Sequence, residues 1–143
     1  ATGGGPVGIL IDASILIEYE RSRIPLESHF EGREEEEFFL SVVSASELLH
    51  GVHRAKDAGT RARRSAWVEA VLERFPLLPV DVSVARSHAQ LWAQLSSEGK
   101  LIGPHDLWLA ATCLAQGLSL VTANVREFER VPGLRLEHWR FGA

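Results

Sequence analysis

The stretch GILIDAS, residues 8 to 14, places an aspartate directly after an apolar run. The run from Val7 to Ile11 is typical of a strand buried on both faces, and the segment from Ser14 to Glu20 predicts a short helix. A charged group gains nothing from an apolar core, so packing does not explain Asp12. The position of this aspartate decides how the rest of the chain is interpreted.

Beyond this stretch, apolar runs of strand length alternate with segments of helical periodicity. Strands that are separated by helices and apolar on both faces predict an α/β fold, with a parallel sheet covered on two sides. In such sheets the ligand crevice lies beyond the carboxyl ends of the strands, where Asp12 falls. Further strands are expected at 38–43, 77–80, 118–122 and 134–136, and helices at 46–56, 61–75, 83–98 and 105–116, with a helical piece at 25–30 and helix stops at Gly99 and Gly117.

Length and composition limit the possible classes of protein. The 143 residues fit one domain, and 45% hydrophobic with 24% charged residues is ordinary globular usage. We expect residues 1–6 to form a flexible arm and residues 7–140 to form a single domain, because no repeat or linker marks a second one. A single cysteine, Cys113, excludes an intrachain disulfide, and no apolar run is long enough to span a bilayer. These features predict a cytoplasmic protein without membrane contact.

Three acids lie at predicted junctions between a strand and a helix: Asp12, Glu47 and Asp106. Each has a local explanation. Asp12 can cap the next helix, Glu47 can complete a capping box with Ser44, and Asp106 gains from the dipole of the helix that it begins. A parallel topology, however, gathers all three at one edge of the sheet. Carboxylates crowded in this way repel one another unless a cation holds them, and oxygen ligands suit Mg²⁺ or Mn²⁺.

A fourth junction follows the strand expected at 118–122. There Asn124 offers a neutral oxygen and Glu127 offers another carboxylate. A polar turn that leads into a helix explains these two residues equally well. The sequence therefore leaves open whether this junction belongs to the metal site.

Four segments carry a resemblance to a known family: ILIDASILIEYER, SVVSASELLHGVHRA, IGPHDLWLAATCLAQG and LVTANVREFERVPGLRLEHW. They resemble PIN-domain proteins, and specifically the VapC-type ribonuclease toxins of bacterial toxin–antitoxin pairs. The resemblance extends from Val7 to Trp139. It implies a three-layer α/β/α sandwich, an Mg²⁺- or Mn²⁺-dependent endoribonuclease, a homodimer, and neutralisation by a cognate antitoxin protein.

By position, Asp12, Glu47 and Asp106 match the metal-binding acids of this family. Many members have an aspartate where this chain has Asn124, so either Asn124 binds metal or orients a water, or Glu127 supplies the missing charge. This departure leaves open whether one metal ion binds or two. No stretch of the sequence distinguishes transfer RNA from ribosomal or messenger RNA as the substrate.

The residues suggest how such a site would hydrolyse RNA. A cation held by Asp12 and Asp106 would polarise the phosphate and activate a water, and Glu47 would complete the cage or accept the proton of that water. Ser14 and Thr122 are candidates for anchoring the carboxylates, although a structural role explains them as well. The alternative is a catalytically silent PIN-like module that binds protein or RNA.

Other classes of enzyme lack their characteristic residues. A haloacid-dehalogenase-type phosphatase would need an aspartate at position 14, which is Ser14, and a dinucleotide or P-loop fold would need its glycines after the first strand rather than at 3–5.

The net charge of −4 gives the chain as a whole no attraction to RNA. A basic segment between Arg54 and Arg64 is the candidate patch for phosphates, with a solvated helix face as its alternative. Trp67, Trp92 and Trp108 lie on apolar helix faces and are expected in the core. Trp139 is expected to be accessible.

Overall fold

The computed structural model describes residues 8–22, 26–33 and 35–139. The arm expected at 1–6, together with Val7, Pro25 and Arg140 at the edges of expected elements, lies outside the described residues. Within them, five strands form one parallel sheet in the order β3-β2-β1-β4-β5. The predicted α/β fold with a parallel sheet is confirmed.

The strands and helices follow the expected order along the chain. The strands are β1 (Gly8–Ile11), β2 (Glu37–Ser41), β3 (Leu77–Leu78), β4 (Leu118–Val121) and β5 (Leu136–Glu137). The helices are α1 (Ala13–Ser22), α2 (Val42–His53), α3 (Ala58–Arg74), α4 (Val82–Ser97), α5 (Pro104–Gln116) and α6 (Val125–Phe128), with a 3₁₀ turn at Leu26–His29. Among the described residues, no helix combines the length and the apolar character that a membrane span requires.

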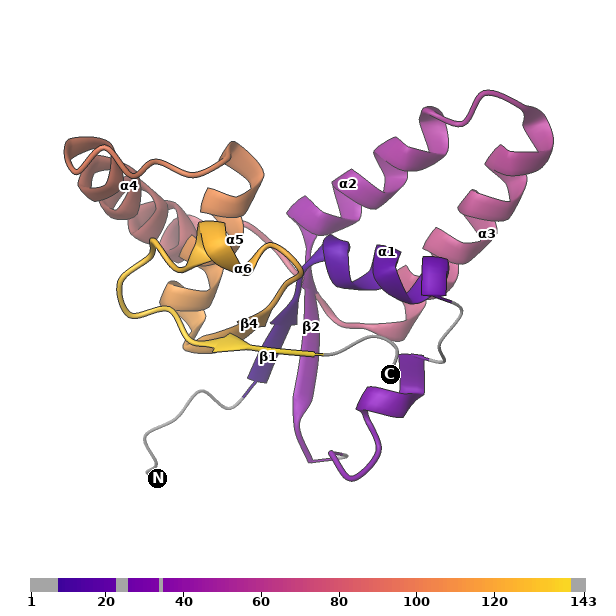
Figure 1. Cartoon of the computed structure of the whole chain (residues 1–143), viewed down its shortest axis with the longest axis horizontal. Helices are drawn as coiled ribbons and strands as arrows, with labels where there is room; N and C mark the ends of the chain where they lie inside the picture. The colour runs from indigo at the N-terminus through magenta and orange to yellow at the C-terminus, as the bar shows by residue number, and fades with distance from the viewer. Residues whose placement is uncertain (1–7, 23–25, 34, 140–143) are drawn as a thin grey trace.

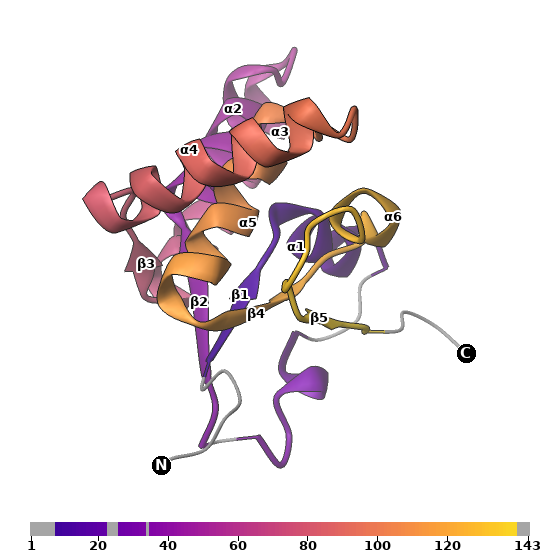
Figure 2. The same ribbon diagram turned by 90° about the vertical axis from the view of Figure 1, so that its left-hand side faces the viewer.

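Two hydrophobic cores lie on opposite faces of the sheet. Ile9 and Ile11 of β1 join the core formed with α1, α2 and α3, whereas Leu10 joins the core formed with α4 and α5. This alternation follows from the two-residue period of a strand. Figure 1 shows α2 and α3 as a hairpin on one side of the molecule, with α4 and α5 on the other, and Figure 2 shows the side that α4 and α5 cover. The sheet is therefore the middle layer of three.

Helix α2 begins four residues earlier than expected. Ser41 has extended backbone angles, and its hydroxyl accepts a hydrogen bond of 3.0 Å from the amide of Val43, so it caps the helix. The β-branched pair Val42 and Val43 favours a strand by propensity, and this preference misplaced the junction. The capping box proposed for Ser44 and Glu47 is wrong, because Ser44 lies inside the helix and its buried hydroxyl has no hydrogen-bond partner.

The remaining boundaries shift by smaller amounts. Asp57 and Asp81 cap α3 and α4, which starts each helix earlier than expected. Gly117 ends α5 with φ of 70°, a left-handed conformation that favours glycine, as predicted. Strands β3 and β5 are shorter than the segments expected at 77–80 and 134–136.

Two expectations for tryptophans are wrong. Trp92 is 53% exposed on α4 rather than in the core, because that helix buries the face that carries Val84, His88, Leu91 and Leu95. Trp139 packs edge-on against Tyr19 and Phe30, with ring centroids 6.3 Å and 5.9 Å away, and is therefore not a free surface ring. Trp67 is half-buried against the core that α1 to α3 form.

The order of the strands fixes where a ligand can bind. The chain moves outward from β1 through β2 to β3, then returns to place β4 on the other side of β1. Neighbouring connections thus diverge between β1 and β4, and this is the switch point at which α/β sheets bind ligands. The first residue after β1 is Asp12, and the first after β4 is Thr122.

Candidate active site

Asp12 is the buried acid at the switch point. It is 5% exposed, and its amide donates a hydrogen bond of 3.0 Å to the carbonyl of Val121, which continues the pairing of β1 with β4. Two hydroxyls donate to its Oδ2: Thr122 at 2.7 Å and Ser14 at 3.0 Å. The amide of Ser14 lies 3.5 Å from Oδ1, so capping of α1 accounts for little of this contact network. Ser14 and Thr122 hold the carboxylate in place.

The same two hydroxyls also fix the loop after β4. Ser14 Oγ accepts a hydrogen bond of 3.0 Å from the amide of Ala123, and Thr122 Oγ1 accepts one of 2.9 Å from the amide of Asn124. Each hydroxyl therefore donates to Asp12 and accepts from this loop. The loop that carries the fourth junction is thereby tied to the acid at the first one.

Asp106, Asn124 and Glu127 form one hydrogen-bonded group. The side-chain amide of Asn124 donates to Asp106 Oδ2 at 3.1 Å and to Glu127 Oε2 at 2.7 Å, and it makes no capping bond to α6. Glu127 Oε1 accepts a hydrogen bond of 2.5 Å from the backbone amide of Gly103, just before α5. Both residues of the fourth junction thus reach Asp106. Asn124 presents its nitrogen rather than its oxygen to the two carboxylates.

Glu47 approaches from α2, on the opposite side of the switch point from α5. Its Oε2 lies 3.6 Å from His105 Nδ1, and its Oε1 is buried without a hydrogen-bond partner. Burial raises the pKa of Glu47, and the charge of Asp12 raises it further, while His105 opposes both effects. An unpartnered buried carboxylate oxygen is costly, which indicates that this oxygen faces a group that binds there.

Asp106 responds to the same crowding. Burial, followed by the charges of Asp12 and Glu127, raises the pKa of Asp106 to about 7. Glu127 titrates in the other direction, since the Gly103 amide stabilises its charged form and lowers its pKa. Because Asp12 acts on both Glu47 and Asp106, the acids from β1, α2 and α5 share one electrostatic environment. The fold thus brings the charges of these acids within reach of one another, as the parallel topology predicted.

These residues fit a hard divalent cation by their chemistry. Their free donors are carboxylate oxygens, one of them is buried without a partner, and the others repel one another across a short gap. As the side chains stand, no three His, Cys, Asp or Glu groups in the described part of the chain lie in ligating positions. Asn124 donates a hydrogen bond to Asp106, and the protonated form of Asp106 donates one to Glu127; an ion bound at Asp106 would replace both.

Two features of the site had little signal in the sequence. The amide of Gly103 fixes Glu127 across 24 residues, and only the Gly-Pro pair before α5 hinted that this backbone was special. His105 precedes Asp106 in the sequence, whereas its contact is with Glu47 on another helix. Both contacts depend on how α5 sits against its neighbours, which no local pattern records.

Comparison with known proteins agrees with this geometry. A model of the PIN domain matches residues 9–134. The chain is 33% identical over 132 residues to Ribonuclease VapC1 of Rickettsia felis, covering 91% of this chain and 95% of that protein. It is 35% identical over 100 residues to the tRNA(fMet)-specific endonuclease VapC of Salmonella typhimurium, covering 70% and 74%.

Solved structures give the same result. In the DNA-bound VapBC of Salmonella typhimurium, one chain matches with a TM-score of 0.85 and 28% identity, covering 94% of this chain and 99% of that one. The chain therefore belongs to the PIN-domain family, and within it to the VapC ribonucleases. The resemblance inferred from the four segments, and the three-layer sandwich that it implies, are confirmed.

Proposed function

We propose that this protein is the toxin of a toxin–antitoxin pair and that it hydrolyses phosphodiester bonds in RNA with the help of Mg²⁺, for which Mn²⁺ can substitute. The observation that carries the proposal is the meeting of Asp12, Glu47 and Asp106 at the switch point, where mutual charge and burial raise the pKa of two of them. A module that only binds a partner has no use for this costly arrangement.

The residues of the chain divide the work. Asp12, Asp106 and Glu127 would hold the cation, which supplies charge to polarise the scissile phosphate and to acidify a bound water. Ser14 and Thr122 hold the carboxylate of Asp12 in place by donating two hydrogen bonds to one of its oxygens. Glu47 has a raised pKa and a free buried oxygen, which suits it to accept the proton of the attacking water. Asn124 positions Asp106 and Glu127 through its amide nitrogen.

The partners follow from the relatives. The structural neighbours include VapBC structures from several bacteria, one of them described as a member of a family of toxin–antitoxin systems, and we propose that a cognate antitoxin protein binds this chain and covers its site. A basic side chain of the antitoxin that enters among the acids would neutralise them and compete with the cation. We also propose that the chain forms a homodimer and acts in the cytoplasm. Light scattering of the purified protein measures whether it is a dimer. Co-expression with the product of the adjacent small gene tests the antitoxin, because a cognate antitoxin is expected to restore growth.

The relative from Salmonella typhimurium is named for initiator transfer RNA, and this makes tRNA(fMet) the first substrate to test. Cleavage of total RNA and of purified tRNA(fMet), with an elongator tRNA for methionine as control, is measured with Mn²⁺. We expect Asp12→Asn and Glu47→Gln each to reduce the cleavage rate by at least about a hundredfold. Equal cleavage by these variants and by the unchanged protein contradicts the proposed site. Absence of any Mn²⁺-dependent cleavage favours the silent module.

A further inference from the structure

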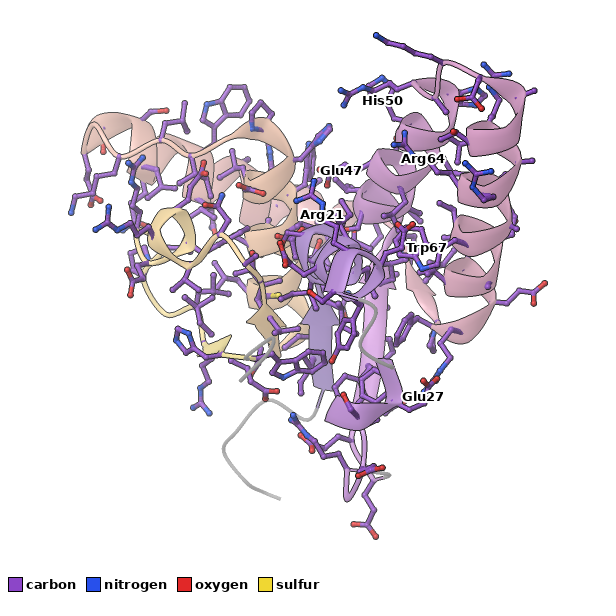
Figure 3. All side chains as sticks on the ribbon, turned by 45° about the vertical axis from the view of Figure 1, so that its right-hand side comes forward. Arg21, Glu27, Glu47, His50, Arg64 and Trp67 are labelled. Atoms are coloured by element: carbon purple, nitrogen blue, oxygen red, sulfur yellow. The ribbon has the colours of Figure 1, made fainter. Side chains whose placement is uncertain are left out.

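A cavity of about 430 Å³ opens beside the acids, between α1, α2 and α3. Its wall includes Glu47, so the cavity and the carboxylate cluster share one side chain. Leu48 and Trp67 form part of an apolar floor. Figure 3 shows Arg64 and Trp67 in the space between α2 and α3, with Arg21 and Glu47 closer to the centre of the molecule.

Three arginines from three parts of the chain line this cavity: Arg21 of α1, Arg54 after α2, and Arg64 of α3. The guanidinium of Arg64 is oriented by a hydrogen bond of 3.2 Å to the carbonyl of Gly51. The guanidinium groups of Arg21 and Arg54 make no hydrogen bond or ion pair with any described residue. Two acids also line the cavity, Glu20 and Glu47, and Glu47 is the proposed proton acceptor of the active site. Three arginines against two acids leave the lining with an excess of positive charge.

The fold separates the basic segment of the sequence into two groups. Arg61 donates a hydrogen bond of 2.8 Å to the carbonyl of Ala55, and Arg63 donates one of 3.2 Å to the hydroxyl of Thr60. These two arginines fasten the start of α3. Arg54 and Arg64 point into the cavity instead, where Arg21, far away in the sequence, joins them.

We propose that this cavity binds the RNA backbone next to the cleaved bond, with Arg21, Arg54 and Arg64 contacting phosphate oxygens. This inference rests on the proposed function and adds to it a place for the substrate. Guanidinium groups match phosphate in shape and charge, and two of the three have no competing partner within the described chain. Glu47 lines the cavity and also belongs to the group of acids. An RNA strand that binds the arginines would therefore continue to the acids. That continuity favours RNA, because successive phosphates can contact the arginines of the cavity and, through the proposed cation, the carboxylates beside it.

The test measures binding separately from cleavage. Asp106→Asn provides a background in which a labelled single-stranded RNA is not cut, and fluorescence anisotropy gives its dissociation constant from 50 to 300 mM KCl with Mg²⁺ present. We expect Arg21→Gln and Arg54→Gln each to weaken binding and to reduce the slope of log Kd against log salt by about 0.7, the value for one phosphate contact on a single strand. Arg64→Gln is expected to do the same. Arg86→Gln, an exposed arginine of α4 outside the cavity, is the matched control and is expected to leave the slope unchanged.

In the protein with all its acids, the same two substitutions at Arg21 and Arg54 are expected to raise KM several-fold with little change in kcat. Unchanged salt slopes for Arg21→Gln and Arg54→Gln overturn the inference. So does a loss of antitoxin binding in these variants without a loss of RNA binding, which would assign the cavity to the antitoxin. Failure of the unchanged protein to cleave RNA contradicts the proposed nuclease, whereas the anisotropy slopes still decide whether the cavity binds RNA.

Discussion

Asp12 illustrates how single residues build this site. Its carboxylate is buried, yet Oδ2 receives hydrogen bonds from Thr122 and Ser14, which come from the two sides of the switch point. Hydrogen bonds to a charged acceptor are stronger than those between neutral groups, so they offset part of the cost of burying the charge. The hydroxyls are therefore as much a part of the site as the acids.

Replacement of Thr122 tests this view at the scale of one atom. In Thr122→Val a methyl group replaces the hydroxyl that donates to Asp12 at 2.7 Å, and we expect an unfolding free energy lower by about 1.5–3 kcal/mol. Because Asp12 is no longer aimed, we also expect a higher Mn²⁺ concentration for half-maximal cleavage. Chemical denaturation and a metal titration of RNA cleavage measure the two effects.

A second buried threonine provides the control. Thr112 donates to the carbonyl of Trp108 at 2.8 Å within α5, and this hydrogen bond does not involve the acids. Thr112→Val is expected to change stability without moving the metal requirement. An equal shift in metal requirement for both variants would mean that Thr122 acts only through stability.

Asp106 gives a prediction for pH dependence. Its pKa in the folded protein is about 7, above the ordinary value of 3.8, so the fold favours its protonated form. A raised pKa contributes stability that is fully present below 3.8 and is lost as the pH rises through 7. Metal-free protein is therefore expected to lose stability between pH 4 and pH 8, and Asp106→Asn is expected to lose less over this range.

Urea unfolding in EDTA at several pH values measures this difference. We expect Asp106→Asn to be more stable than the unchanged protein at pH 8 while its RNA cleavage is abolished. Asp81→Asn makes the same chemical change at the cap of α4, where Asn caps as well as Asp, and it should leave the profile unaltered. Parallel pH profiles for Asp106→Asn and the unchanged protein would show that the fold does not raise the pKa of Asp106.

At the scale of elements, the start of α2 decides where Glu47 lies. A helix that starts at Val42 places Glu47 in its second turn, facing the acids of β1 and α5, whereas a start at Ser46 would have placed it in the first turn. Ser41 fixes the start because its hydroxyl satisfies the amide of Val43. Ser41 thus stabilises the start of α2, whereas the buried hydroxyl of Ser44 makes no hydrogen bond.

Substitution of each serine distinguishes a helix that is capped by Ser41 from one that begins with a capping box of Ser44 and Glu47. Ser41→Ala removes the cap and is expected to lower the unfolding free energy by about 1 kcal/mol. Ser44→Ala removes a buried hydroxyl that has no partner and is expected to be neutral or stabilising. Thermal and urea unfolding of the two variants give the comparison. A greater loss for Ser44→Ala than for Ser41→Ala would restore the capping box and refute this start of α2.

The same junction shows how far the sequence predicts the structure. The parallel sheet and the placing of Asp12, Glu47 and Asp106 at one edge of it were predictable, because an alternation of buried strands and helices leaves few topologies. The role of Asn124 was not predictable, since its amide bridges two acids only when α5 and α6 are packed together. The exposure of Trp92 and the burial of Trp139 likewise depend on which surfaces meet.

At the scale of the whole molecule, the last described strand, β5, is bound to the segment that precedes β2. Arg33, in the segment before β2, donates hydrogen bonds of 2.6 Å and 2.9 Å to the two carboxylate oxygens of Glu137 in β5. Trp139 follows and packs against Phe30 and Phe38. This contact closes the core that α1 to α3 form, on the face of the sheet opposite α4 and α5.

Glu137→Gln tests this link. The guanidinium of Arg33 lowers the pKa of Glu137 below 4.5, so the ion pair contributes stability that is present above pH 4.5 and is lost as the pH falls through the lowered value. We expect the variant to be less stable than the unchanged protein by about 1 kcal/mol at pH 7, with the difference shrinking towards pH 3.5. Glu98→Gln, at the exposed C-terminal end of α4, controls for loss of charge alone. A stability difference that stays constant from pH 7 to pH 3.5 would show that Glu137 acts through packing and not through its charge.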